Sequence, residues 1–216
     1  MKTAIVIGAT GLVGSSLTNQ LLEHPEYSGV SVFVRRSTNL SHQKLTEHIV
    51  DFDKTDDWKH LLQGDVLFSA MGTTLNKAGS KAAQYRIDYT YQYNVAAAAA
   101  SNGVPAYVLI SSAGASESSL IFYSKMKGEL DREVKKLPFS RIRIIKPGIL
   151  AGNRAESRPM EALSIKMMTA LGKIPLIRKF RPIPASVVAR AMIQAAVDSE
   201  AGVKAYELEE VFTLGQ

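Results

Sequence analysis

The sequence predicts an α/β fold in which a doubly wound parallel sheet carries helices on both faces. Two observations lead to this prediction. Short runs of β-branched and aliphatic residues alternate along the chain with longer segments of helical periodicity. A glycine-rich turn also joins the first apolar run to the first helical segment, which is typical of the Rossmann fold. The chain of 216 residues is long enough for one such domain with a full core.

The first half of the chain supplies four expected strands and three expected helices. The strands cover residues 3–7 and 30–34, a run that ends at 49–52, and residues 66–70. The helices cover residues 12–22, 57–62 and 82–101. The pair Asn102-Gly103 marks the C-terminal end of the long helix, because glycine readily adopts the left-handed conformation found there.

The second half continues the alternation and then loosens. We expect strands at residues 106–111 and 141–146, with a helix over 122–137 that Pro138 stops. Beyond Pro147 we expect a loop over 148–159, helices over 161–171 and 185–197, and an extended segment at 182–184. We interpret residues 1–216 as a single domain, in which about 148–185 form a small C-terminal substrate cap over the strand ends.

Composition and charge narrow the classes of function. The chain has no cysteine, which excludes disulfides and thiolate chemistry. The net charge is +6, but the basic residues are scattered, so no nucleic-acid partner is expected. No apolar run approaches the ~20 residues that span a bilayer, and the N-terminus lacks a cleavable-signal pattern, so we expect a cytoplasmic protein without a membrane partner. The four histidines show no ligand spacing, and no metal is expected.

The glycine-rich turn predicts a binding site for the diphosphate of a dinucleotide. Gly8, Gly11 and Gly14 follow the pattern G-x-x-G-x-x-G between a strand and a helix, with Thr10, Leu12 and Val13 between them. Gly8 permits a tight turn, Gly11 lets the backbone approach the diphosphate, and Gly14 lets the helix pack on the strand. The free amides of the helix N-terminus then face the anion. A turn with no ligand is the alternative, and the strand-turn-helix context disfavours it.

The end of the second strand indicates which dinucleotide is bound. NAD-selective sites place an acid there to bind the ribose 2′-hydroxyl, whereas this chain has Arg35 and Arg36. A guanidinium pair matches a 2′-phosphate, so we expect NADP(H), although two solvated surface arginines remain the alternative. We expect Asp51 and Phe52 to lie along the adenine. The residues expected beneath the adenosine ribose and the diphosphate are Ala70, Met71 and Gly72.

A candidate catalytic group follows the fifth strand. Tyr123 and Lys127 are four residues apart on an expected helix, so their side chains share one face. A carbonyl that accepts hydride also needs a proton, and a tyrosine supplies one readily only when a nearby ammonium favours its phenolate. A serine at the strand end can donate to the carbonyl oxygen, and we choose Ser112 with Ser111 as the alternative.

Together these motifs resemble the atypical short-chain dehydrogenase/reductases, and in particular the HIV Tat-interactive-protein-like oxidoreductase branch. The resemblance runs from about residue 3 to residue 200. It is carried by the glycine loop, the paired arginines, the serine pair, and the strings MGTT (71–74), KAGS (77–80), FYSKMKGE (122–129) and KPGILAGNRAESRP (146–159).

The resemblance implies NADP(H) binding by the glycine loop, by Arg35 and Arg36, and by Met71 and Gly72. It implies Tyr123 as proton donor with Lys127 as its partner, and it adds contacts from Leu150 and Arg158 to the nicotinamide end. One departure concerns the long helix, where Asp88 stands roughly at the place of an asparagine in classical members.

The expected function is therefore an NADP(H)-dependent reductase of a small carbonyl-like molecule. A redox-sensing protein that binds NADP(H) with little or no turnover is the alternative. Sugar-nucleotide epimerisation is a third possibility, but the roughly 65 residues after Pro147 are few for a sugar-nucleotide lobe. The long helices also offer a surface for pairing into a homodimer.

Overall fold

The computed structural model describes residues 1–151 and 181–216. Within them, seven strands form one sheet in the order β3-β2-β1-β4-β5-β6-β9, and all neighbours are parallel. A second, two-stranded sheet joins β7 to β8. The strands are β1 (Lys2–Ile7), β2 (Tyr27–Val34), β3 (Leu45–Ile49), β4 (Val66–Ser69), β5 (Ala106–Ile110), β6 (Arg141–Lys146), β7 (Leu150–Ala151), β8 (Ile183–Pro184) and β9 (Gly202–Glu207).

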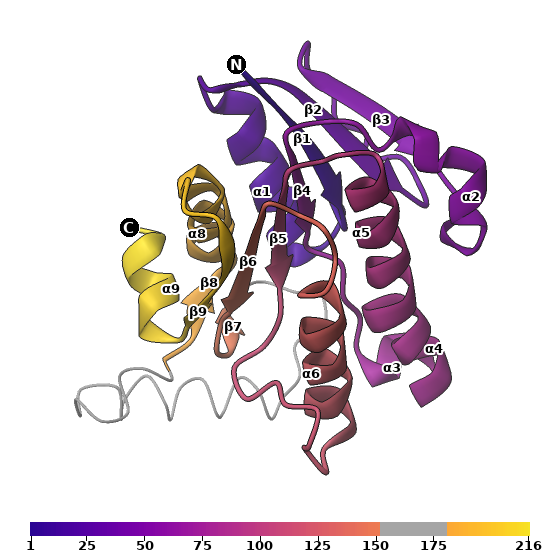
Figure 1. Cartoon of the computed structure of the whole chain (residues 1–216), viewed down its shortest axis with the longest axis vertical. Helices are drawn as coiled ribbons and strands as arrows, with labels where there is room; N and C mark the ends of the chain where they lie inside the picture. Colours follow the sequence, from indigo (N-terminus) through magenta and orange to yellow (C-terminus); the bar gives the residue numbers. More distant parts are fainter. Residues whose placement is uncertain (152–180) are drawn as a thin grey trace.

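Helices cover both faces of the sheet, which confirms the expected doubly wound α/β architecture. Helices α1 (Leu12–Glu23), α8 (Ala185–Val197) and α9 (Glu209–Leu214) lie on one side, whereas α5 (Gln92–Ser101) and α6 (Phe122–Val134) lie on the other (Figure 1). Each side has its own hydrophobic cluster, because strands covered on both faces bury both sets of alternating side chains. The central strands β1, β4 and β5 are accordingly almost entirely buried.

The strand order reverses between β1 and β4. The chain builds β2 and β3 on one side of β1, and then crosses over to build β4, β5 and β6 on the other. The arrows of β1, β5 and β6 point the same way in Figure 1, so the carboxyl ends of these strands share one edge. Ligands of open α/β sheets bind in the crevice outside this edge, at the point of reversal.

The long helix at 81–101 contains a π-helical turn. Residues Lys81–Tyr85 (α4) and Gln92–Ser101 (α5) are α-helical, but Arg86–Tyr91 between them follows the wider π pattern. Such turns are rare and occur often at functional sites. The sequence predicts the length of this helix closely but not the π turn.

Four other elements differ from the sequence-based expectation. The third strand ends at Ile49, not at Phe52, because Asp51 accepts a hydrogen bond from the Asp53 amide (3.0 Å) and starts a 3₁₀ helix, Phe52–Lys54. Strand β9 and helix α9 were not expected, since β9 is an exposed edge strand without an apolar pattern. A short helix, α3 (Leu75–Ala78), likewise follows β4.

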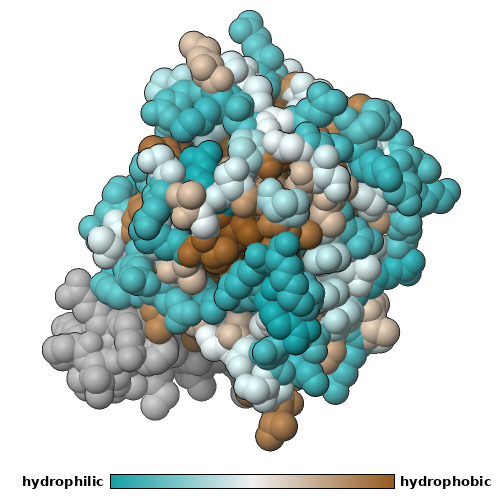
Figure 2. All heavy atoms as spheres, in the orientation of Figure 1, coloured by the Kyte–Doolittle hydropathy of each residue, from teal (hydrophilic) through white to brown (hydrophobic). Residues whose placement is uncertain are grey.

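The expected helix at 161–171 and most of the expected cap at 148–185 lie outside the described residues. Polar side chains cover most of the face seen in Figure 2, with one apolar area near its centre. Within residues 1–151 and 181–216, every helix is too short or too polar to span a bilayer.

Candidate functional site

The turn between β1 and α1 is built so tightly that only glycine fits at two positions. Gly8 has φ +82°, and a Cβ there would lie 2.5 Å from the carbonyl carbon of Ala70 on the neighbouring strand end. A Cβ on Gly14 would lie 2.0 Å from the Gly8 carbonyl oxygen. The Gly11 amide closes the turn by donating to the Gly8 oxygen at 2.9 Å. The turn therefore brings the first helical residues against the end of β1.

Helix α1 presents its first amides at this turn. Its N-cap is Gly11, whose lack of a side chain leaves the helix without a side-chain cap. Thr10 and Gly11 are exposed and Leu12 is half-buried, whereas the Val13 side chain belongs to the core. Uncapped amides and the positive end of the helix dipole favour an anion, and a diphosphate is an anion of suitable size.

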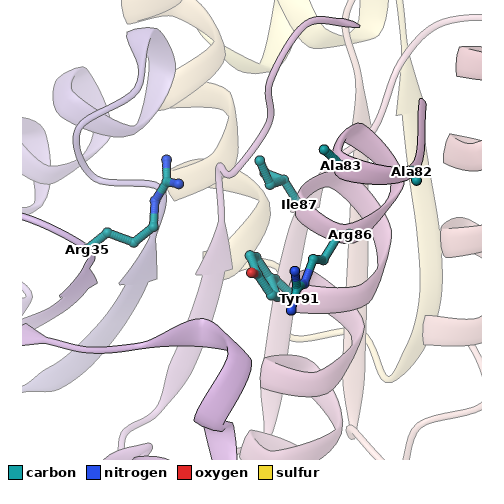
Figure 3. A pocket seen from close by; sticks show the side chains of 6 residues that line it. All are labelled: Arg35, Ala82, Ala83, Arg86, Ile87 and Tyr91. Carbon is teal, nitrogen blue, oxygen red and sulfur yellow. The ribbon is translucent and has the colours of Figure 1, made fainter. Parts of the chain in front are cut away.

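A cavity of about 370 Å³ lies where the adenosine end of a dinucleotide is expected. Arg35, directly after β2, projects from one wall (Figure 3). The opposite wall comes from the helix at 81–101 and is lined by Ala82, Ala83, Arg86, Ile87 and Tyr91. Arg36 is also exposed but is not among the lining residues. The cavity thus combines an apolar surface, suited to a purine, with two guanidinium groups.

The residues after β3 divide between the surface and the core. Asp51 is exposed and caps the 3₁₀ helix, whereas the Phe52 side chain is only 3% exposed. The Phe52 ring packs against Trp58 (centroids 5.4 Å apart) and Tyr91 (5.6 Å). The contact of Asp51 and Phe52 with an adenine stays a prediction: the Phe52 ring packs beneath Tyr91, and only Asp51 of this pair has an exposed side chain.

Buried hydrogen bonds fix the segment that follows β4. Ala70 and Met71 are half-buried and Gly72 is exposed, beside the glycine turn. The fully buried carboxylate of Asp88, in the π turn, accepts the Thr73 amide at 2.7 Å. Burial raises the pKa of Asp88, although the Lys127 charge and this amide oppose the shift. Asp88 therefore connects the π turn to the segment after β4 by a buried hydrogen bond. This hydrogen bond is a structural reason for a carboxylate at this position.

The expected catalytic residues lie at the carboxyl end of β5 and on α6. Tyr123, in the first turn of α6, is 38% exposed. Lys127, one turn later, is 3% exposed and its ammonium donates to the Ile110 carbonyl oxygen at 3.2 Å. Ser111 is buried, whereas Ser112 is half-buried and its hydroxyl donates to the Ala113 carbonyl oxygen at 3.3 Å. Of the two serines, Ser112 is the more accessible to a ligand.

A buried ionic group lies behind these residues. Asp131, one turn beyond Lys127 on α6, is 4% exposed and lies 3.5 Å from the ammonium of Lys146 at the end of β6. Burial raises the pKa of Asp131, although the Ser111 hydroxyl and Lys146 oppose the shift. Lys146 also pairs with Glu207 at 3.0 Å. This group joins β6, β9 and α6 behind the candidate catalytic residues.

The loop from β5 to α6 rests against the helix at Gly128. A Cβ there would lie 2.3 Å from the Glu117 amide nitrogen, so a side chain at this position would displace the loop. Within the remaining expected contacts, Leu150 is half-buried and pairs with Ile183 between β7 and β8. Arg158 lies outside the described residues.

Three further residues beside the cavity were not expected from the sequence: Arg86, Asp53 and Tyr91. The Arg86 guanidinium contacts the Asp53 carboxylate at 2.6 Å and lies over the Tyr91 ring, 5.9 Å from its centroid. No local motif marks these residues, because they come from two separate segments. No group of three or more metal-ligating side chains is present in residues 1–151 and 181–216.

Comparison with known proteins gives a family match. Residues 8–151 match the family model described as NAD(P)H-binding. The protein named fmp52-1, mitochondrial, of Aspergillus terreus is 35% identical over 100% of this chain and 96% of its own length. The corresponding protein of Aspergillus oryzae is 37% identical over 100% of this chain and 94% of its own length.

Solved structures share the fold at low sequence identity. The Bordetella bronchiseptica enzyme WbmH, in complex with NAD+, has a TM-score of 0.71 and 15% identity, covering 96% of this chain and 75% of WbmH. A UDP-N-acetylglucosamine 4-epimerase from Methanobrevibacter ruminantium M1 also has a TM-score of 0.71, with 14% identity over 98% of this chain and 80% of its own. These similarities establish the Rossmann-type arrangement.

The expectation of a cytoplasmic protein is wrong by this comparison. The relatives from Aspergillus terreus, Aspergillus oryzae and Aspergillus fumigatus are all named as mitochondrial proteins. The expectation relied on the absence of a signal-peptide pattern and of an apolar span. Neither absence distinguishes one aqueous compartment from another.

Proposed function

The chain belongs to the NAD(P)H-binding family, and from that premise we propose that it is an NADP(H)-dependent reductase of a small carbonyl-like substrate. Within the family we place it in the atypical short-chain dehydrogenase/reductases, in the HIV Tat-interactive-protein-like branch. The unusual strings KAGS (77–80) and RAESRP (154–159) support this finer assignment.

The observation that carries the proposal is the cavity between Arg35 and the helix at 81–101. The diphosphate would lie on the amides that follow Gly8 and Gly11, in a turn where a Cβ on Gly8 would lie 2.5 Å from the Ala70 carbonyl carbon. The adenosine would then extend toward the cavity of about 370 Å³, which Arg35 lines, and the Arg35 guanidinium would donate to a phosphate at the ribose 2′ position. The donor set suits a phosphate better than a hydroxyl, which favours NADP(H) over NAD(H).

The chemistry follows from the residues beyond β5. The bound cofactor supplies or accepts the hydride. Tyr123, exposed at the start of α6, delivers the proton to the substrate oxygen, and the buried Lys127 supports it from the next turn with its positive charge. Ser112 offers a hydroxyl to the same oxygen as charge develops, being the accessible serine of the pair.

Two measurements test the proposal. Calorimetric titration with NADPH and with NADH gives the two dissociation constants. We expect NADPH to bind more tightly than NADH, and we expect Arg35→Ala to abolish this preference. Turnover is then assayed over a broad panel of carbonyls and quinones for the wild type, Tyr123→Phe and a control, Tyr93→Phe, on the long helix. Tyr123→Phe should remove turnover and spare NADPH binding, whereas Tyr93→Phe should change neither.

The rival function is a protein that senses NADP(H) without useful turnover. It uses the same cofactor site, and a wild type that binds NADPH but reduces no member of the panel would favour it. A sugar-nucleotide epimerase is the third candidate, and the epimerase compared above is similar to this chain in fold, at 14% sequence identity.

We also propose a mitochondrial location, as the names of the fungal relatives suggest. Subcellular fractionation with the endogenous protein tests it, and recovery outside mitochondria would contradict it.

A further inference from the structure

Arg86 lies at the adenosine end of the site and has no role in the reaction proposed above. It is the first residue of the π-helical turn and lines the same cavity as Arg35, from the opposite wall (Figure 3). Its guanidinium lies 2.6 Å from the Asp53 carboxylate and 5.9 Å from the centroid of the Tyr91 ring. A second cation therefore borders the cavity, and it contacts a carboxylate that is not among the lining residues.

The carboxylate of Asp53 bears on the choice of cofactor. Dinucleotide sites that prefer NAD use an acidic side chain to accept from the ribose 2′-hydroxyl, and the same charge repels a 2′-phosphate. Asp53 is 40% exposed and follows β3, which pairs with the strand that Arg35 terminates. Its contact with Arg86 neutralises this charge. An uncovered Asp53 would oppose the preference that Arg35 creates.

The contact between Arg86 and Asp53 lets the guanidinium adjust its position and donate to a phosphate as well. The Arg86 side chain is 59% exposed, and ion pairs exposed to this degree are weak and screened by salt. A phosphate monoester carries nearly two negative charges at neutral pH and accepts two parallel hydrogen bonds from one guanidinium. Arg35 and Arg86 together would balance that charge from the two walls of the cavity.

We propose that Arg86 is a specificity-determining residue for the cofactor: its guanidinium donates to the 2′-phosphate of NADP(H) while it stays beside Asp53, and it thereby masks the carboxylate that otherwise favours NAD(H). The proposal rests on the NADP(H) function proposed above and adds a residue from a separate segment of the chain. Stacking of Arg86 on the adenine is the competing role, since a guanidinium can lie over an aromatic ring system.

Two small probes separate these roles. Adenosine 2′,5′-bisphosphate carries the 2′-phosphate and 5′-AMP does not, while the adenine is common to both. Their dissociation constants are measured by calorimetry for the wild type, Arg86→Gln, Asp53→Asn and Arg35→Gln. Lys54→Gln is the matched control, because it removes an exposed cation next to Asp53 that does not line the cavity. Thermal unfolding of each variant confirms that it is folded.

We expect Arg86→Gln to weaken the bisphosphate about tenfold or more and 5′-AMP less than about twofold, because charge-assisted hydrogen bonds to the 2′-phosphate are lost. Asp53→Asn should bind the bisphosphate as tightly as the wild type or more tightly, and Lys54→Gln should match the wild type. Arg86→Gln should also raise NADH affinity relative to NADPH. The double variant Arg86→Gln/Asp53→Asn should not show this increase in NADH affinity, because the carboxylate that accepts from the 2′-hydroxyl is absent.

Equal weakening of both probes by Arg86→Gln, or no weakening of either, would overturn the proposal. If Arg35→Gln abolishes the preference for the bisphosphate while Arg86→Gln retains it, the role of Arg86 fails and the NADP(H) function stands. A wild type that binds the two probes equally would overturn both.

Discussion

Substituting Gly14 by alanine tests the packing on which the cofactor site depends. The new Cβ would lie 2.0 Å from the Gly8 carbonyl oxygen, so helix α1 or the glycine turn must shift by about 1 Å or more to restore van der Waals contact. Overpacking of this kind costs about 1–3 kcal/mol of unfolding free energy. For a chain of this length, that loss lowers the melting temperature by roughly 2–12 °C.

The same shift should weaken cofactor binding. Moving the turn disturbs the hydrogen bond from the Gly11 amide to the Gly8 oxygen (2.9 Å) and misaligns the amides that face the diphosphate. Loss of one charge-assisted hydrogen bond corresponds to roughly 10–100-fold in the dissociation constant of NADPH.

Gly29→Ala is the matched control for this experiment. Its Cβ would meet only the Thr3 methyl at 3.6 Å, within strand β2, so its stability should equal or slightly exceed that of the wild type. Urea denaturation and calorimetry give the two quantities. A Gly14→Ala protein with the stability and NADPH affinity of the control would refute this account of the turn.

Three further predictions concern other parts of the site and its support. Gly128→Ala should lower turnover more than NADPH affinity, because its Cβ would lie 2.3 Å from the Glu117 amide nitrogen and displace the loop before Tyr123. Steady-state kinetics give turnover and calorimetry gives NADPH affinity, and an equal fall in the two would contradict this prediction. Burial raises the pKa of Asp131, so its protonated form stabilises the fold below the ordinary carboxyl pKa, and this contribution is lost as pH rises through the folded pKa. The unfolding free energy of Asp131→Asn, measured by urea denaturation across pH, should therefore fall less than that of the wild type as pH rises above about 4. Burial lowers the pKa of His48, whose ring stacks on Phe33 with the centroids 4.6 Å apart. The neutral form of His48 therefore stabilises the fold above the ordinary histidine pKa, and this contribution is lost as pH falls through the folded pKa. The stability of His48→Phe should accordingly fall less than that of the wild type when pH drops below about 6.5.

The sequence predicts the centre of the fold better than its edges. Strand β6 and helix α8 have the expected bounds, and β1, β4 and β5 differ by a residue or so, because buried strands and amphipathic helices have distinct apolar patterns. Strand β9 is exposed along nearly its whole length and therefore has no such pattern. The end of β3 was misplaced, because the hydrogen bond that Asp51 makes to start the 3₁₀ helix competes with the strand.

In the candidate site, too, local motifs could be predicted from the sequence, whereas contacts between distant segments could not. The glycine turn is visible in the sequence, since its three glycines are contiguous with a strand and a helix. The contact between Asp53 and Arg86 joins residues 33 positions apart, on segments brought together only by the sheet order. Ser111 and Ser112 are adjacent and identical in type, so the sequence does not tell them apart. The structure does, because Ser111 is buried and Ser112 is half-buried.

The π-helical turn at Arg86–Tyr91 also affects how this protein is aligned with its relatives. A π turn takes up about one residue more than an α turn, and each residue advances the helix by roughly 100°. A relative whose helix is regular here would need a gap of one position within the turn. Without that gap, every residue on its N-terminal side would be matched to a neighbour on a different face, and the cavity wall would be assigned to the wrong side chains.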